Sequence, residues 1–217
     1  TYRTGFFYSD DRGVSWQTGH GGAFERTTVR SFVGMGDRHY LATSGLGVHV
    51  SADAGATWEA INEGLTMPFV AALAVWSGHL YAGTDGRGVF VFDPLAASWS
   101  PAGDDGMARS HVTGFLGHGE RLFACSFGDG VFELVDGQWE PRNADLTDLK
   151  VRGVTMHGGT LYAGTAEQGV FESVDGGGTW SPVNDGLTRP QVRALVVFRR
   201  ELFAGTDRAG LFRATGP

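Results

Sequence analysis

The segment GVFESVDGGGTWSPVNDGL at residues 169–187 decides the fold, because a close copy, GVHVSADAGATWEAINEGL, stands at residues 47–65. The tryptophan of this segment recurs along the chain at intervals of 42, 41, 40 and 41 residues, as Trp16, Trp58, Trp99, Trp139 and Trp180. A fixed period of about 40 residues is the mark of a repeat architecture. The chain therefore consists of five copies of one unit.

Each copy predicts four short β-strands. The first strand reads VAALAV at residues 70–75, the second reads LYAGT at 80–84, the third follows a Gly-Val pair, and the fourth begins at the tryptophan. Gly, Asp and Asn punctuate the junctions, and no segment has helical periodicity. Four strands in a unit of about 40–45 residues are typical of one blade of a β-propeller. We therefore predict an all-β, five-bladed β-propeller with four antiparallel strands per blade, and residues 1–217 as a single domain.

The two ends of the chain indicate how such a ring closes. A third strand at residues 4–9 and a fourth strand at 15–19 open the chain, which ends after a first, second and third strand. We expect the N-terminal strands to pair with the C-terminal blade, which removes an open sheet edge and leaves one third strand surplus. The alternatives are an open fragment of a longer propeller, or two chains that complete one another. A closed ring predicts a monomer.

Composition excludes several classes of protein. Glycine provides 35 of the 217 residues and proline only 7, so glycine serves turns in a chain whose 41% hydrophobic content is enough for a large core. No apolar run approaches the roughly 18 residues of a membrane span, and no signal segment opens the chain, so we expect no membrane insertion. The net charge of −7 disfavours nucleic acid as a partner.

The chain offers no pattern for a metal or a cofactor. The single cysteine, Cys125, excludes an internal disulfide and a cysteine-based zinc site. Four of the histidines fall one per blade, which does not bring three or four ligands to one ion. We expect no cofactor and no metal. The sequence leaves the compartment open, with an extracellular or periplasmic location favoured.

The most specific motif is S-x-D-x-G-x-[ST]-W between the third and fourth strands. In the third unit, Phe92, Pro94 and Ala96 replace its first three fixed positions, and in the fourth the turn is two residues shorter. Repetition at equivalent positions favours a structural role over catalysis or calcium binding, because a turn aspartate accepts backbone N–H bonds, glycine takes a positive φ and tryptophan packs between sheets. The complete copies are Ser9, Asp11, Gly13 and Trp16; Ser51, Asp53, Gly55 and Trp58; and Ser173, Asp175, Gly177 and Trp180.

This motif resembles the Asp-box, or BNR, repeat of bacterial sialidases, sortilin-like receptors and photosystem-assembly-type propellers. The resemblance covers essentially the whole chain. It is specific for the fold and poorly specific for function. It implies that the Asp-boxes lie on the face of the propeller away from the ligand site.

The opposite face is built from the connections between second and third strands, which vary while their flanks repeat. Charged and aromatic residues of these loops are Asp85, Arg87, Phe127, Asp129, Glu167, Asp207 and Arg208. The residue after the first valine of the first strands adds Arg30, Arg152 and Arg193. Three converging arginines would bind an anionic group despite the negative net charge. The alternative is that these arginines only pair with the facing carboxylates.

Two readings of function follow. The first is a non-enzymatic binding or scaffold module that recognises a protein or a small anionic or hydroxylated ligand, such as a glycan. The second is a glycoside hydrolase, because sialidases also gather three arginines here; its candidate carboxylates are Glu167, Asp129 and Asp207. The sialidase Arg-Ile-Pro motif is absent, and no tyrosine pairs visibly with a glutamate, so the binding module is favoured.

The third unit departs most from the others and is a second place for specialisation. It loses its Asp-box and gains MARSH at residues 107–111 before the next first strand. Arg109 and His111 should then share one face with Phe127 and Asp129. We add Arg109 and His111 to the candidate ligand-binding residues.

Overall fold

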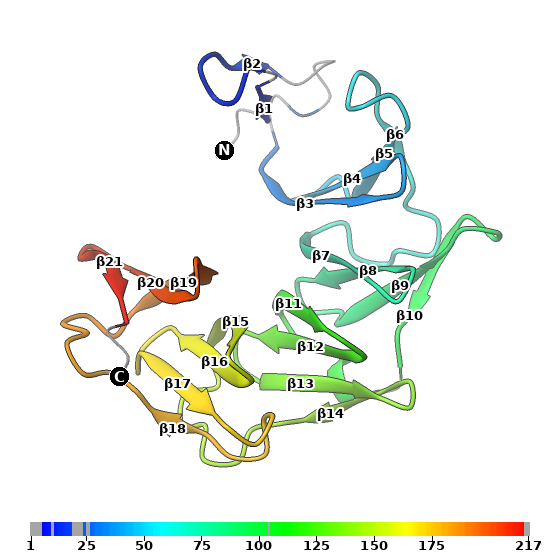
Figure 1. Cartoon of the computed structure of the whole chain (residues 1–217). Coiled ribbons are helices and arrows are strands. Elements are labelled where there is room, and N and C mark those ends of the chain that lie inside the picture. Colours follow the sequence, from blue (N-terminus) through cyan, green and yellow to red (C-terminus); the bar gives the residue numbers. More distant parts are fainter. Residues whose placement is uncertain (1–5, 10, 19–23, 25–26, 104, 215–217) are drawn as a thin grey trace. The chain divides into compact units, whose positions relative to one another are not determined.

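The computed structural model describes residues 6–9, 11–18, 24, 27–103 and 105–214, and it divides the chain into two compact units, Thr1–Ala102 and Gly103–Pro217. Figure 1 labels the strands in chain order. Among the described residues, regular structure is β-strand except for one 3-10 helix, η1, at Asp105–Met107. The predicted all-β fold is confirmed.

The first unit holds three antiparallel sheets. The N-terminal sheet pairs β1 (Phe7–Tyr8) with β2 (Gln17–Thr18). The second sheet joins, in order, β3 (Val29–Met35), β4 (Arg38–Thr43), β5 (Val48–Ser51) and β6 (Glu59–Ala60). The third sheet joins β7 (Val70–Trp76), β8 (His79–Thr84), β9 (Val89–Asp93) and β10 (Ser98–Pro101).

The second unit continues the same meander, in which each strand pairs with its neighbour in sequence. Its first sheet joins β11 (Val112–His118), β12 (Arg121–Ser126), β13 (Gly130–Val135) and β14 (Gln138–Pro141). Its second sheet joins β15 (Val151–His157), β16 (Thr160–Thr165), β17 (Val170–Ser173) and β18 (Ser181–Pro182). The last sheet joins β19 (Val192–Phe198), β20 (Glu201–Thr206) and β21 (Gly210–Arg213).

The two ends differ from the predicted four strands per blade. Of the expected strands 4–9 and 15–19, residues 4, 5 and 19 lie outside the described residues, and the structure places β1 and β2 within the rest. These two strands pair with each other, and the last sheet has three strands. Closure of the ring through the last sheet, and the assignment of one domain, stay predictions.

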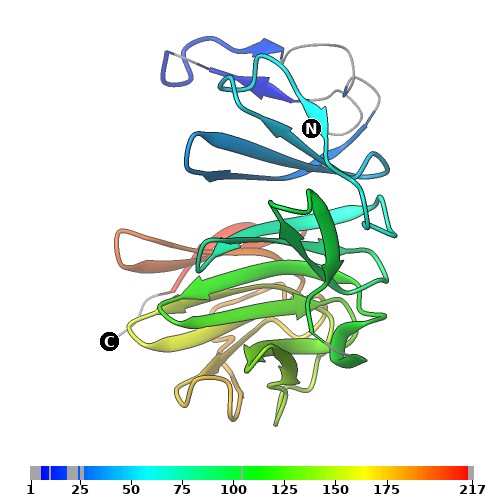
Figure 2. The same cartoon turned by 90° about the vertical axis from the view of Figure 1, so that its right-hand side faces the viewer.

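Sheets within each unit pack through their first strands. In the first unit β3 contacts β7, and in the second β11 contacts β15 and β15 contacts β19. Figure 2 shows the β11–β14 sheet (green) stacked on the β15–β18 sheet (yellow). At this contact Leu116 of β11 shares one apolar cluster with Val154 and Met156 of β15. Each sheet thus buries apolar residues on the face that meets its neighbour.

The first strands carry a β-bulge at their second residue. Pairing with the second strand skips from Val151 to Gly153 in β15, and the same shift recurs in the other four first strands. A bulge leaves one residue unpaired and re-aims its side chain. The skipped residues are Arg30, Ala71, Thr113, Arg152 and Arg193. The fold itself therefore singles out the position of the three predicted arginines.

The repeated tryptophans are only partly a core feature. Trp99, Trp139 and Trp180 are buried. The Trp180 Nε1 donates to the Arg142 carbonyl of the preceding sheet at 2.8 Å. Trp16 is largely exposed, because the two-stranded sheet to which its segment belongs lacks a first and a second strand. That Trp16 packs between sheets stays a prediction, as does the ring closure that would cover it.

An asparagine that follows the fourth strand fastens three of the four four-stranded sheets, all but β7–β10. The Asn62 Oδ1 accepts from the Val48 N–H at 2.8 Å, and its Nδ2 donates to the Leu46 carbonyl at 3.0 Å. Asn143 and Asn184 make the equivalent pairs of bonds. A Cβ on Gly47, at φ 73°, would lie 2.1 Å from Asn62 Oδ1, so glycine is required there. The asparagine thereby fixes the loop between second and third strands, where ligand residues were predicted.

We expect Asn62→Ala to lower the free energy of unfolding by about 1–3 kcal/mol, because two backbone groups lose their partner. Glu63→Ala, at the exposed neighbour, is the control and should leave stability within about 0.5 kcal/mol of wild type. Urea unfolding followed by tryptophan fluorescence measures both. Equal stability of the two variants would show that the fastening is dispensable.

Candidate functional site

The Asp-box hairpins are closed by their own side chains. The Asp53 Oδ1 accepts from the Thr57 N–H and from Ser51 Oγ, both at 2.8 Å, and its Oδ2 accepts from Thr57 Oγ1 at 2.6 Å. Ser51 Oγ in turn accepts from the Gly55 N–H at 2.8 Å. The hairpins of Asp11 and Asp175 repeat these bonds. Both oxygens of each carboxylate are thus engaged within the turn.

These bonds lower the pKa of all three Asp-box carboxyls to about 2, and the largest cause for Asp53 is the hydrogen bond from the Thr57 hydroxyl. A lowered folded-state pKa stabilises the fold above the unfolded value of 3.8. That contribution is lost as the pH falls through about 2.

We therefore expect the stability of the wild type to fall between about pH 4 and pH 2, and part of this fall to disappear in Asp53→Asn. Thermal melts at intervals of half a pH unit measure the effect. The control is Asp37→Asn, which replaces an exposed carboxylate in the turn after β3. An Asp53→Asn variant whose melting temperature follows the wild-type pH profile would contradict the role of this carboxylate.

In the third hairpin an aspartate outside the Asp-box pattern closes the turn. Asp93, one position from the expected site, accepts through Oδ1 from the N–H groups of Leu95 at 2.8 Å and Ala96 at 3.2 Å. The DPLA sequence is an aspartate-initiated turn signal. The third unit therefore keeps a carboxylate-closed hairpin with different spacing.

On the predicted ligand side of the second unit, Arg152 is a half-buried cation beside an aromatic ring. Its Cζ lies 4.9 Å from the centroid of the Phe127 ring, and its side chain is half-buried. Among the described residues it makes no hydrogen bond or ion pair. The pKa of Arg152 is lowered, first by burial and then by the charge of Arg193. Two bulge arginines thus lie close enough in this unit to repel one another.

Arg193 has a partner in place. Its Nη2 donates to Asp207 Oδ2 at 3.0 Å, and this bond lowers the pKa of Asp207. An ionised Asp207 does not serve as a general acid near neutral pH. Arg193 therefore matches the predicted alternative in which an arginine pairs with a facing carboxylate. Arg30 is exposed in the first unit, and convergence of all three arginines stays a prediction.

The other predicted carboxylates are also engaged. Glu167 forms an ion pair with Lys150, the only lysine of the chain. Asp129 accepts from Ser126 Oγ at 3.2 Å through Oδ2. A retaining glycosidase needs two carboxyls about 5 Å apart, one of them protonated. The role of Glu167, Asp129 and Asp207 in hydrolysis stays a prediction.

Asp148, which the sequence did not single out, holds the Glu167 loop. It is buried, and its Oδ2 accepts from the N–H groups of Glu167 at 2.8 Å and Gln168 at 3.1 Å. Its Oδ1 accepts from the Lys150 N–H at 3.0 Å. The position directly before the next first strand could have drawn attention to it. Asp148 ties the loop to the segment that leads into Arg152.

We expect Asp148→Ala to lower the free energy of unfolding by on the order of 2–3 kcal/mol, because three backbone donors lose a charged acceptor. Asp185→Ala, at an exposed carboxylate, is the control. Chemical unfolding gives the stability, and amide exchange at Glu167 and Gln168 reports the loop. Unchanged exchange at those two amides would refute the tie.

The remaining candidates are distributed over both units. Asp85 and Arg87 are exposed in the first unit, and Arg208 and Arg109 are exposed in the second. His111 is half-buried, with its ring centroid 6.1 Å from that of Phe127. The structure thus places His111 and Arg152 beside the Phe127 ring.

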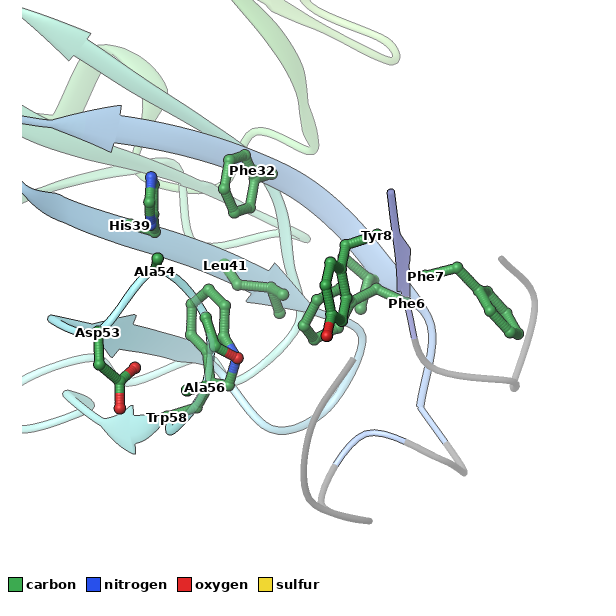
Figure 3. Close-up of a pocket in the computed structure, with 12 residues that line it drawn as sticks. Phe6, Phe7, Tyr8, Phe32, His39, Leu41, Asp53, Ala54, Ala56 and Trp58 are labelled. Carbon is green, nitrogen blue, oxygen red and sulfur yellow. The ribbon is translucent and has the colours of Figure 1, made fainter. Parts of the chain in front are cut away.

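A separate pocket of about 510 Å³ opens in the first unit. Figure 3 shows Phe6, Phe32, Leu41 and Trp58 around it, with the ring of His39 beside Phe32. The Phe32 and His39 rings stack at 5.4 Å, and Phe6 meets Trp58 edge-on at 5.6 Å. The sequence analysis missed this pocket. Its walls are largely apolar, with the engaged Asp53 at the rim.

Neither a metal centre nor a membrane helix is found in the described residues. No group of three His, Cys, Asp or Glu side chains there is placed to hold an ion. Likewise, that part of the chain has no helix able to cross a bilayer.

Comparison with known proteins identifies the class of fold. The BNR/Asp-box repeat model matches residues 7–18. No match was found among the curated proteins. Solved β-propellers are similar along nearly the whole chain, so the fold is a β-propeller with Asp-box repeats.

Three solved structures illustrate the similarity. The extracellular domain of the hybrid two component system BT3049 from B. thetaiotaomicron is 18% identical with a TM-score of 0.80, and the match covers 97% of this chain and 31% of that one. YCF48 bound to D1 peptide is 18% identical with a TM-score of 0.69, and the match covers 97% of this chain and 72% of that one. An ancestral GH74 enzyme is 20% identical with a TM-score of 0.77, and the match covers 98% of this chain and 34% of that one. The chain thus spans about a third of the length of the first and last of these.

Proposed function

We propose that this chain is a non-enzymatic binding propeller that holds an anionic group of its ligand at Arg152. The supporting observation is the state of that side chain: half-buried, stacked on Phe127 and without a polar partner among the described residues. Buried cations are normally paired within the protein. A ligand carboxylate supplies the missing partner.

The surroundings of Arg152 favour a carboxylate over a bulkier polyanion. The Arg152 Cζ lies over the Phe127 ring, and the fork of guanidinium N–H groups suits a carboxylate, which it binds by two parallel bonds. Arg193 lies near enough to add charge, while Glu167 and Asp207 nearby are already paired. The ligand is therefore an acidic side chain of a protein or an acidic sugar.

The similar propellers support a binding role in a coarse sense. One is described bound to a peptide, and another is an extracellular domain. By analogy of fold alone, we propose a protein or glycan ligand met outside the cytoplasm. No observation in the site favours hydrolysis over binding.

We expect Arg152→Ala to weaken ligand binding by about 10- to 100-fold, the loss typical of charge-assisted hydrogen bonds. Arrays of acidic peptides and of glycans with sialic or uronic acids identify the ligand, and calorimetric titration measures its affinity. Arg152→Lys keeps the charge without the fork and should recover only part of the affinity. Arg200→Ala, at an exposed arginine in the turn between β19 and β20, is the control.

Arg152→Ala with unchanged affinity would place the ligand elsewhere and overturn this proposal. Turnover of any arrayed glycoside, abolished by Glu167→Gln, would overturn the non-enzymatic assignment instead. The two results are distinguishable, because the first concerns affinity and the second concerns product.

A further inference from the structure

We propose that the residue directly after the second strand decides whether the bulge arginine of the same sheet is open to an anionic ligand. In the β15–β18 sheet this residue is Ala166, and in the last sheet it is Asp207. Ala166 is then the specificity-determining residue of the Arg152 site. The inference rests on the proposed binding of an anion at Arg152, and it names the residue that makes this arginine available.

Ala166 and Asp207 occupy equivalent positions in their sheets. In both sheets the second strand ends with a threonine that pairs with the valine before the bulge arginine. The N–H of the next residue then donates to a backbone carbonyl ahead of the first strand. These bonds are 3.0 Å long from Ala166 to Lys150 and 2.9 Å long from Asp207 to Gln191. The place of Asp207 beside its arginine therefore predicts the place of a carboxylate at position 166.

In the last sheet this position holds the counter-ion of the bulge arginine. The Arg193 Nη2 donates to Asp207 Oδ2 at 3.0 Å. The pKa of Asp207 is lowered first by this hydrogen bond and then by the charge of Arg193. A carboxylate that follows the second strand is thus close enough to pair with the arginine of its own sheet and to neutralise it.

In the β15–β18 sheet the same position carries only a methyl group. Ala166 is buried and has no side-chain acceptor. Arg152 instead lies over the ring of Phe127, with its Cζ 4.9 Å from the ring centroid. Phe127 follows the second strand of the preceding sheet, so the equivalent position there supplies the ring. One loop thus provides an aromatic contact and the next provides an alanine where the last sheet has a counter-ion.

Two further carboxylates act on Arg152 through their charge, and both are engaged elsewhere. Burial and the charge of Arg193 lower the pKa of Arg152, and the charges of Asp207 and Asp148 act in the opposite direction. Asp207 is held by Arg193, and Asp148 accepts three backbone N–H groups. Neither can turn to Arg152 without giving up these bonds. A carboxylate in place of Ala166 would have no such prior partner.

The five sheets combine the bulge position and the position after the second strand in different ways. Arginine and aspartate coincide in the last sheet, where they pair, whereas two other arginines are combined with serine or alanine. These two positions together set the charge that each sheet offers on the predicted ligand side. The combinations are Arg30 with Ser44, Ala71 with Asp85, Thr113 with Phe127, Arg152 with Ala166, and Arg193 with Asp207.

The pKa of an introduced carboxyl tests the pairing without any ligand. We expect the new carboxyl of Ala166→Asp to titrate about one pH unit or more below the same carboxyl in Ala166→Asp combined with Arg152→Gln, because a neighbouring arginine favours the charged form. NMR titration of the aspartate carboxyls measures both. The control is Ala144→Asp, at an exposed alanine of the same unit, whose new carboxyl should not respond to Arg152→Gln. Equal pKa values with and without Arg152 would overturn the proposal.

Binding of a fluorescein-labelled penta-glutamate peptide tests the availability of Arg152. We expect Ala166→Asp to bind this probe at least about tenfold more weakly than Ala166→Asn, which has nearly the same shape without the charge. Ala144→Asp adds the same charge elsewhere and should stay within about twofold of the wild type. Asp207→Ala releases Arg193, so it should strengthen binding at least about threefold. This last variant tests the proposal even where Ala166→Asp does not fold.

Equal binding by Ala166→Asp and Ala166→Asn would overturn the proposal, and so would an unchanged affinity of Asp207→Ala. Failure of the proposed function has a different signature. The probe then does not bind, or Arg152→Ala binds it as tightly as the wild type does, while the carboxyl titration still reports whether positions 152 and 166 pair.

Discussion

The packing of one sheet on the next through their first strands is the interaction on which this fold depends. A four-stranded sheet of this length has no core of its own, so it is stable only where its apolar faces are covered. Val33 packs against the apolar cluster that includes Leu73, and Leu116 and Val154 pack against one cluster, so neighbouring sheets meet in the same way in both units. The repeat period, the bulges and the fastening asparagines all serve to present these faces at a constant spacing.

The bulge at the start of each first strand holds a residue that varies between blades without disturbing the packing of the sheets. Because the bulged residue drops out of the regular alternation, its identity is free of the packing requirement. The five positions hold arginine three times, alanine once and threonine once. Thr113 donates from its hydroxyl to the Val151 carbonyl of the next sheet at 2.7 Å, whereas Arg152 stacks on Phe127. The same position thus makes a hydrogen bond to the next sheet in one blade and a cation–π contact in another.

The sequence was sufficient for the fold because the repeat signals are local and redundant. The tryptophan spacing, the LYAGT strands and the Asp-box each predict the same unit, and the sheets follow them. Asn62 and its equivalents were within reach as well, since an Asn follows the fourth strand in INEGL, RNADL and VNDGL. The exposure of Trp16 could not be predicted from the sequence, because it depends on which strands accompany its sheet.

The candidate site could be predicted only as a set of residue types. Position along the repeat predicts one side of the propeller for Arg152, Arg193, Glu167 and Asp207. It does not predict which cation pairs with which anion. That choice depends on the reach of individual side chains: Lys150 takes Glu167 and Arg193 takes Asp207. Asp148 was missed because its role is to accept three backbone bonds, and only its place shortly before a first strand marks it in the sequence.

The pairing of charges also bears on the two proposed functions, binding and hydrolysis. Catalysis by carboxylates needs one group kept protonated and another free to attack, and this requires environments that push two pKa values apart. Here Glu167 is held by Lys150 and Asp207 by Arg193, and the pKa of Asp207 is lowered rather than raised. Arg152, in contrast, is a half-buried cation with no polar partner among the described residues. This arrangement of partners supports the proposed recognition of an anionic ligand.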